Sequence, residues 1–298
     1  MDLKMIGISV ILLGVVTPPE THAAIRRMAS APASCGRFAN ATTRRNARIV
    51  GGSECFEGEF PWMVSFKNEL GHFCGGFVIA DRYVLSAAHC FLTHHGKKRE
   101  DEVSATIGEF SLRTPEKTKD IPVPIEEIIL HPGYTPNSRE FDIAIIKLKE
   151  SVYIHPSVEP ICLPAPKTRE EAQFQLATRS TVTTAGWGKT SFDQSYHDWL
   201  KETDFLRKVE VNLWDTEECR TLYKSFNNFP SNSFICAGVK GSQSCVGDSG
   251  SPLMHLESSR WVAIGIVSVG QQCGAKGRPS VYTDLADYVP WIREIIPS

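Results

Sequence analysis

The chain has 298 residues, of which 42% are hydrophobic and 22% are charged, a composition typical of a globular protein with a full core. Its formal net charge of -2 gives no indication of nucleic-acid binding. The charge is unevenly placed, because residues 1–48 hold seven Lys/Arg against two acids, while residues 49–298 hold 25 against 32. A basic leading segment therefore precedes an acidic domain.

The first residues predict a signal peptide over residues 1–23. Lys4 precedes an apolar run from Met5 to Val16, and small residues follow at Ala23 and Ala24. The run suits a signal-peptide core and is too short to span a bilayer as a helix; a buried core helix is the alternative. A signal peptide implies a secreted, extracellular protein without a membrane span, in which the nine cysteines are available for disulfides.

Beyond residue 48, short runs rich in β-branched and aromatic residues predict an all-β domain. These runs are Trp62–Phe66, Tyr83–Ala88, Asp142–Leu148, Thr181–Trp187, Lys208–Leu213 and Trp261–Val269. Asp215 followed by Glu218 predicts a capped short helix through Tyr223. The tail Asp287–Ile296 predicts an amphipathic helix with Pro290 in its first turn.

Three polar residues stand out by their surroundings. His89 ends a strand-like run, Asp142 opens an apolar one, and Ser249 lies between glycines in the sequence G-D-S-G. A serine hydroxyl is a poor nucleophile until a base removes its proton, and histidine is the usual base near neutral pH. The imidazole in turn needs an anionic partner. Each residue alone is more often structural, but the three together predict nucleophilic catalysis.

Six motifs occur in the order found in the chymotrypsin/trypsin-like serine peptidases, which residues 49–298 resemble. They are RIVGG (48–52), SAAHC (86–90), DIAIIKL (142–148), GWG (186–188), GDSGSP (247–252) and PSVYTDL (279–285). The resemblance implies two packed six-stranded antiparallel β-barrels with a C-terminal α-helix. It also implies an active site in the cleft between the barrels.

The resemblance assigns roles to the residues of that cleft. His89 would be the general base, Asp142 its orienting carboxylate and Ser249 the nucleophile that forms an acyl-enzyme. The backbone N–H groups of Gly247 and Ser249 would form the oxyanion hole. A protein or peptide is the implied substrate, and neither a metal nor another cofactor is expected.

Family members are made as inactive precursors, which would explain the basic residues 24–48 as a propeptide. Cleavage between Arg48 and Ile49 would free an ammonium that pairs with Asp248 and orders the oxyanion hole. The same segment holds a glycosylation sequon at Asn40.

The cysteines are assigned by the same resemblance. The implied disulfides are Cys74–Cys90, Cys219–Cys236, Cys245–Cys273 and Cys35–Cys162. The last would keep residues 24–48 attached as a light chain after cleavage. In trypsin the cysteine that matches Cys55 forms a disulfide with a cysteine near the position of Lys208, and this sequence has no cysteine there. It is either free and buried, bonded to another chain, or a competitor for Cys35.

The resemblance places Gln243, Ser244, Ser268, Gly270 and Ser280 around the substrate pocket. Gln243 stands where trypsin has an aspartate, so a buried Lys or Arg would go unpaired. Ser280 replaces a common glycine and would narrow the pocket wall. We therefore expect narrow specificity for an uncharged side chain, and activation by a separate trypsin-like protease.

Further departures from the family pattern keep an alternative function open. Ser251 stands where a second glycine is usual, and Val269 where a tryptophan is common. Arg139 would line the adjacent subsite and favour an acidic neighbour in the substrate. The alternative is a weakly active or inactive protease homologue that acts as a binding or regulatory protein. An active protease would also have protein inhibitors as partners.

Overall fold

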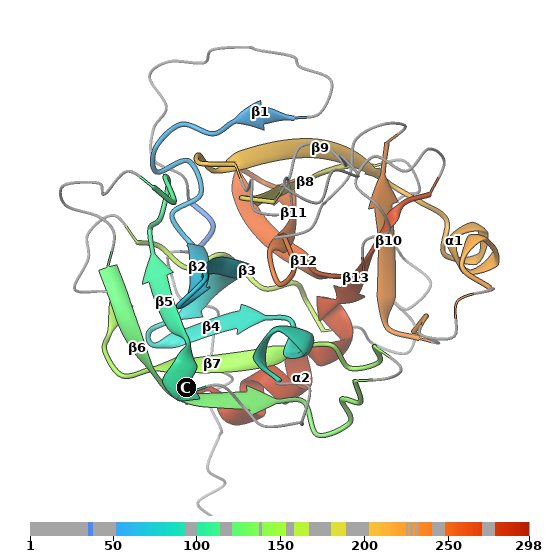
Figure 1. Cartoon of the computed structure of the whole chain (residues 1–298). Coiled ribbons are helices and arrows are strands. Elements are labelled where there is room, and N and C mark those ends of the chain that lie inside the picture. Colours follow the sequence, from blue (N-terminus) through green and yellow to red (C-terminus); the bar gives the residue numbers. More distant parts are fainter. Residues whose placement is uncertain are drawn as a thin grey trace, which may run out of the picture.

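The protein is described from a computed structural model of the whole chain (Figure 1). The description covers residues 35–37, 52–92, 100–113, 121–136, 139–152, 158–166, 180–188, 203–224, 226, 229–230, 232–239, 248–269 and 278–297. These residues form thirteen strands, two α-helices and two 3₁₀ turns, so the prediction of an all-β domain is confirmed.

The first barrel closes in the strand order β2-β3-β4-β7-β6-β5, and every neighbouring pair is antiparallel. Its strands are β2 (Met63–Asn68), β3 (Gly71–Ala80), β4 (Tyr83–Ser86), β5 (Ser104–Ile107), β6 (Ile121–Leu130) and β7 (Ala144–Leu148). Two 3₁₀ turns, η1 (Ala88–Phe91) and η2 (Glu100–Glu102), lie between β4 and β5.

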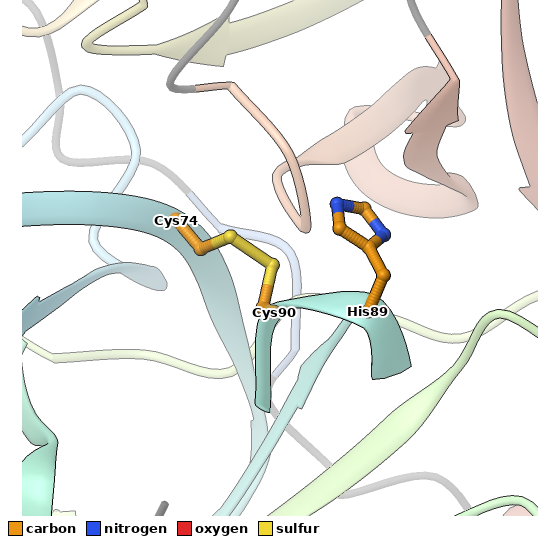
Figure 2. A group of neighbouring side chains, drawn as sticks. All are labelled: Cys74, His89 and Cys90. Atoms are coloured by element: carbon orange, nitrogen blue, oxygen red, sulfur yellow. A yellow bond between two sulfur atoms is a disulfide. The ribbon is translucent and has the colours of Figure 1, made fainter. Parts of the chain in front are cut away.

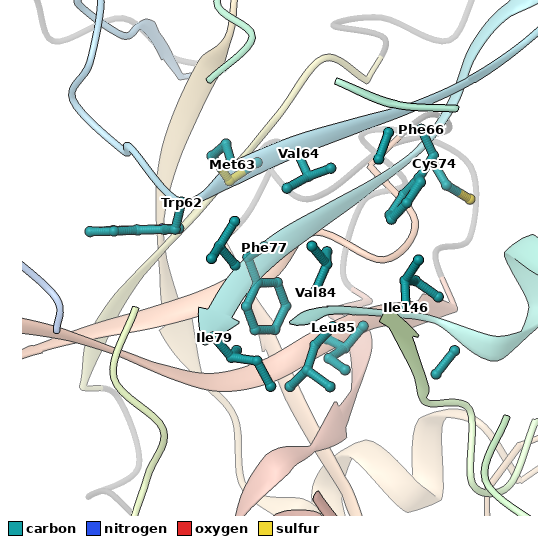
Figure 3. Packing of buried hydrophobic residues seen from close by; sticks show 14 of the residues in the cluster. Trp62, Met63, Val64, Phe66, Cys74, Phe77, Ile79, Val84, Leu85 and Ile146 are labelled. Atoms are coloured by element: carbon teal, nitrogen blue, oxygen red, sulfur yellow. The ribbon is translucent and has the colours of Figure 1, made fainter. Parts of the chain in front are cut away.

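Apolar side chains from β2, β3 and β4 fill the first barrel, as Figure 3 shows for Phe66, Phe77 and Leu85. The rings of Phe66 and Phe91 meet edge to face with centroids 4.9 Å apart. Fully burying a side chain of this size contributes about 1.5–3 kcal/mol. The core continues toward the second barrel, because the Trp62 indole N–H donates to the sulfur of Met254 at 3.3 Å.

The second barrel has the strand order β9-β10-β13-β12-β11-β8 and closes through the pairing of β8 with β9. Its strands are β8 (Thr181–Gly186), β9 (Arg207–Leu213), β10 (Phe234–Gly238), β11 (Pro252–Glu257), β12 (Arg260–Val269) and β13 (Ser280–Asp284). The short β1 (Ser53–Glu54) pairs with Arg207 and Lys208 at the start of β9. The prediction of two closed six-stranded barrels is therefore confirmed.

The helix predicted after Asp215 is confirmed as α1 (Thr216–Leu222). The Asp215 carboxylate accepts hydrogen bonds from the N–H groups of Glu217 and Glu218, each at 2.9 Å. These two bonds satisfy donors that an α-helix leaves without intrahelical partners.

The C-terminal helix is confirmed as α2 (Leu285–Ile295), but the prediction that Pro290 lies in its first turn is wrong. The helix begins two residues before Asp287, with Asp284 as its N-cap accepting from the N–H of Ala286, so Pro290 lies in the interior. A proline there removes one backbone hydrogen bond. The burial of four side chains offsets that loss: Leu285, Tyr288, Val289 and Ile292.

Within the described residues, three disulfides join Cys35 to Cys162, Cys74 to Cys90 and Cys219 to Cys236. The implied Cys245–Cys273 pair lies outside the described residues. Cys55 is free and buried, and Cys35 is bonded to Cys162, so Cys55 does not take Cys35 as its partner in this structure. Burial raises the pKa of its thiol.

The leading segment meets the second barrel at Cys35 and Gly36. The N–H of Gly36 donates to the carbonyl of Pro160 at 2.8 Å, and its carbonyl accepts from the N–H of Trp261 at 2.9 Å. Gly36 has a φ of +68°, and a Cβ there would lie 2.3 Å from the Trp261 carbonyl oxygen. Only glycine fits this contact, which fixes the backbone beside the Cys35–Cys162 disulfide.

None of the helices in the described part of the chain has the length and apolar character needed to cross a membrane.

Candidate active site

His89 lies on η1, directly after β4 ends at Ser86. The disulfide between Cys74 of β3 and Cys90 holds this turn to the barrel wall, and Figure 2 shows the His89 ring projecting beside it. The two sulfur atoms and a His89 nitrogen lie within 4.8 Å of one another. Because the sulfurs are bonded to each other, they offer no thiolate to a metal ion.

Asp142 lies fully buried just before β7, and its carboxylate is hydrogen-bonded on both oxygens. Oδ1 accepts from the backbone N–H of His89 at 2.9 Å, and Oδ2 accepts from Nδ1 of His89 at 2.8 Å. The Ser268 hydroxyl also donates to Oδ2, at 2.5 Å, and the Thr283 hydroxyl donates to the Asp142 carbonyl at 2.9 Å. Ser268 and Thr283 belong to β12 and β13, so the second barrel helps to hold an aspartate of the first.

These contacts determine the charge of Asp142 and the tautomer of His89. Burial alone would raise the pKa of the Asp142 carboxyl, but the attraction of His89 and the hydrogen bonds from His89 and Ser268 outweigh it and lower the pKa. The ionised carboxylate only accepts hydrogen bonds, so Nδ1 of His89 must carry a proton. A neutral imidazole in this tautomer has an unprotonated Nε2, which can act as a base.

Ser249 lies on a tight turn that is hydrogen-bonded to the first barrel. The Ser249 carbonyl accepts from the N–H of Gly75 at 2.7 Å. Gly250 has a φ of +84°, and a Cβ there would lie 2.4 Å from the Gly75 carbonyl oxygen and 3.2 Å from the Ala87 nitrogen. Glycine at this position therefore lets the Ser249 turn pack against the segment that leads into His89.

The side chain of Asp248 explains both glycines of the G-W-G sequence. Its Oδ1 accepts from the N–H of Gly188 at 2.8 Å. A Cβ at Gly186 would lie 2.1 Å from Oδ1, and a Cβ at Gly188 would lie 2.5 Å from Oδ2. Trp187 between them is fully buried, and its indole N–H donates to the Phe110 carbonyl at 3.2 Å. A side chain at either glycine would displace the Asp248 carboxylate.

Three buried serines line the second-barrel side of this region. Ser268 donates to Asp142, whereas Ser280, on β13 opposite Ala237, has a buried hydroxyl with no hydrogen-bond partner among the described residues. Ser251, directly after the Ser249 turn, has the same unsatisfied hydroxyl in that part of the chain. The other predicted site residues lie outside the described residues: Asn40, Arg48, Ile49, Gln243, Ser244, Gly247 and Gly270.

Sequence patterns do not indicate the groups that hold the site together. Ser268 is predicted only as a pocket residue, and no pattern predicts a role for Thr283 or Gly75. Thr283 lies within one of the six motifs and Gly75 follows a disulfide cysteine, but neither has a local pattern that indicates its partner. Both partners are more than 100 residues away in the sequence.

Comparisons with known proteins agree with this geometry. The family model described as Trypsin matches residues 49–292. The CLIP domain-containing serine protease B4 of Anopheles gambiae is 35% identical over 266 residues, which cover 84% of this chain and 70% of the relative. With the two barrels and the site between them, these matches identify the chain as a serine endopeptidase of the trypsin family.

Proposed function

We propose that this protein hydrolyses peptide bonds through an acyl-enzyme, with Ser249 as nucleophile, His89 as base and Asp142 as its orienting carboxylate. The observation that carries the proposal is the double hydrogen bond from His89 to the ionised Asp142, which places the proton of a neutral His89 on Nδ1 and leaves Nε2 available as the base. The contact of the Ser249 turn with Gly75 supports it, because it ties the nucleophile to the barrel that bears the base.

In this mechanism Nε2 of His89 takes the hydroxyl proton as Oγ of Ser249 attacks the substrate carbonyl carbon. The N–H groups of Gly247 and Ser249 stabilise the negative charge on the carbonyl oxygen. His89 then gives the proton to the departing amine as the C–N bond breaks. Water, deprotonated by the same nitrogen, cleaves the acyl ester and returns Ser249 to its free form.

The chain is a zymogen in this proposal, with a signal peptide over 1–23, a propeptide over 24–48 and the peptidase domain over 49–298. Cleavage after Arg48 frees the ammonium of Ile49, which pairs with Asp248. The position of Asp248 next to Ser249 supports this role, since a new charge partner for Asp248 acts directly on the nucleophile turn. The protein is secreted, carries its glycan at Asn40 and meets protein inhibitors outside the cell.

Cleavage in this scheme yields a two-chain enzyme. The support is the disulfide between Cys35 and Cys162, together with the two hydrogen bonds of Gly36. Gel electrophoresis of the cleaved protein tests it, because the light chain should separate only after reduction.

We further propose that the pocket accepts an uncharged side chain, because Gln243 supplies no negative charge for Lys or Arg. Ser280 supports a restricted pocket, since its side chain is fully buried on a pocket strand where the family commonly has glycine. The zymogen then depends on a separate trypsin-like protease. Purified zymogen should not cut itself at Arg48, and rapid, concentration-dependent self-cleavage would contradict the dependence.

Fluorophosphonate labelling tests the nucleophile and the activation together. The purified chain is labelled before and after a trypsin-like protease cuts at Arg48, with Ser249→Ala as the matched control. Labelling that appears only after the cut, and only with Ser249, supports the proposal. If Ile49 is freed and no labelling appears, the proposal is contradicted, and the alternative of an inactive homologue that acts as a binding protein is favoured.

A peptide library then tests the pocket. The activated enzyme should cleave after uncharged residues, and Gln243→Asp should add cleavage after Lys and Arg. Efficient cleavage after Arg by the unmodified enzyme would overturn the proposed specificity.

A further inference from the structure

Arg139 directs one guanidinium nitrogen inward, to the carboxylate that holds His89. Its Nη1 lies 3.8 Å from Oδ2 of Asp142, and the Arg139 side chain as a whole is 31% exposed. Nη1 itself is buried and has no hydrogen-bond partner among the described residues. From the sequence we expect Arg139 to line a substrate subsite, but this nitrogen faces the interior.

The backbone of this segment is held in place by its neighbours. Arg139 and Phe141 both have left-handed φ angles, of 56° and 55°. The Phe141 ring stacks on His131 with centroids 4.8 Å apart and an interplanar angle of 3°. A conformation that L-residues rarely adopt persists only where its surroundings fix it, so the approach of Arg139 to Asp142 is built into the fold.

Oδ2 of Asp142 is therefore shared by three groups. It accepts from Nδ1 of His89 at 2.8 Å and from Ser268 at 2.5 Å, and the Arg139 cation lies at 3.8 Å. A proton on His89 would place a second positive charge on an oxygen that already faces one. In a partly buried site this repulsion is only weakly screened by solvent.

No other charged or titratable group on the described elements around this pair contacts Oδ2 of Asp142. Burial raises the pKa of Tyr134 to about 12, so its phenol is neutral in the working range. Asp248 faces Gly188, and Asp284 caps α2. The rings of His131 and Tyr288 contact the Phe141 ring, and Glu140 is a partly exposed residue next to Phe141 in the sequence.

We propose that Arg139 is a positioning residue of the active site, which shares the Asp142 carboxylate with His89 and thereby extends activity to lower pH. This proposal rests on the assignment of His89 as the base. By opposing the protonated form of His89, the Arg139 cation keeps more of the base in its working form at a given acidity.

The pH profile of ester hydrolysis tests the proposal. The enzyme cut at Arg48 is assayed with p-nitrophenyl acetate, an uncharged substrate that needs no specificity pocket, and Ser249→Ala gives the blank rate. In Arg139→Gln the midpoint of the acidic limb of kcat/KM should rise by about 0.5–1 pH unit. Arg139→Lys, which keeps the charge, should restore most of the original midpoint.

Arg220→Gln is the matched control, because it removes the same charge from α1, where Arg220 pairs with Glu217. Its midpoint should stay that of the unmodified enzyme. An unchanged midpoint in Arg139→Gln would overturn the proposal, even if the variant loses preference for substrates with an acidic residue.

A direct titration separates this proposal from the proposed function. The protein is labelled with ¹³C-histidine, His89→Gln assigns the resonance, and its chemical shift is followed against pH in the unmodified chain and in Arg139→Gln. A higher midpoint in the variant supports the role of Arg139 even if the ester is not hydrolysed. An equal midpoint overturns it even if the enzyme is active.

Discussion

Asp142 and the two serines Ser251 and Ser280 are all fully buried, but their polar groups differ in whether they find hydrogen-bond partners. Asp142 has a donor for each carboxylate oxygen and one for its carbonyl. Ser251 and Ser280 have no partner for their hydroxyls among the described residues. Both serines stand where the resemblance to the family leads us to expect glycine. The Asp142 carboxylate is thus fully hydrogen-bonded, while the two serines are this chain's own departures.

The difference indicates where the chain can change without losing its chemistry. A buried polar group that loses its partner costs about 1–3 kcal/mol, so a matched network resists substitution. A hydroxyl that is already unsatisfied can be replaced at no such cost. We therefore expect substitutions on the two sides to have opposite effects.

The largest effect should come from breaking the matched network at its centre. Asp142→Asn replaces an oxygen by a donor, which favours the tautomer of His89 with the proton on Nε2. In triad enzymes the same change lowers kcat by about 10⁴-fold, and we expect a loss of that order in the Arg48-cleaved enzyme. Active-site titration should accompany the kinetics, to exclude a loss of folded protein. Retention of a tenth of the activity or more would contradict the orienting role of Asp142.

A second matched pair tests stability instead of activity. Glu109 is almost fully buried, with a side chain 1% exposed, and pairs with Lys67 from β2. Lys67→Met would remove the Lys67 cation from beside a buried carboxylate and should lower the free energy of unfolding by about 2–4 kcal/mol. Urea denaturation measures the loss, and the double variant with Glu109→Gln should recover much of it. Equal stability of Lys67→Met and the unmodified protein would show that the pair is not needed.

The unsatisfied side should respond in the opposite direction. Ser251→Ala removes a buried hydroxyl that has no partner in the described structure, so it should raise the free energy of unfolding by about 1 kcal/mol. Ser65→Ala is the matched control, because Ser65 is equally buried but hydrogen-bonds to Nδ1 of His72 at 2.8 Å. The control should be destabilised by a similar amount. A loss of stability in both variants would refute the contrast.

The smallest expected effect concerns His131, whose Nδ1 can accept its hydrogen bond only while the ring is neutral. Nδ1 of His131 accepts from the N–H of Gly133 at 3.1 Å, and burial lowers the pKa of His131 from its ordinary value of 6.5. The unfolded chain therefore takes up this proton before the folded protein does. The resulting stability is present above pH 6.5 and is lost as the pH falls.

The unmodified protein should accordingly lose stability faster than His131→Gln between about pH 7 and 5. The difference should be a few tenths of a kcal/mol at most, because the ring is partly exposed and solvent screens its charge. Thermal unfolding across this range measures it. Parallel curves for the two proteins would contradict the effect.

The sequence predicts the barrels well because their strands carry local signals. The predicted run Lys208–Leu213 differs from β9 by one residue, and Trp261–Val269 differs from β12 by one residue. Strand β6 carries no such signal, since Pro122 and Pro124 argue against a strand. They are tolerated because this part of β6 pairs with β5 only, and β7 joins from Ile125 onward.

The site is predicted by residue type but not by contact. His89, Asp142 and Ser249 are each indicated by their own neighbours in the sequence, whereas the hydrogen bond of Ser268 to Asp142 spans 126 residues. No local pattern reports such a pairing. The turn between β11 and β12 shows the same limit, because Ser258 and Ser259 adopt φ values of 46° and 67° without the glycine that usually indicates them.

The hydrogen bonds of Ser268 and Thr283 to Asp142 have a consequence for how the enzyme loses activity. Each barrel has a closed sheet of its own, so one could stay folded while the two come apart. Such a separation would break the hydrogen bonds of both hydroxyls to Asp142 and inactivate the enzyme before either sheet unfolds. The catalytic rate therefore reports on the contact between the two barrels. On heating, it should fall at a lower temperature than the circular dichroism signal of the strands.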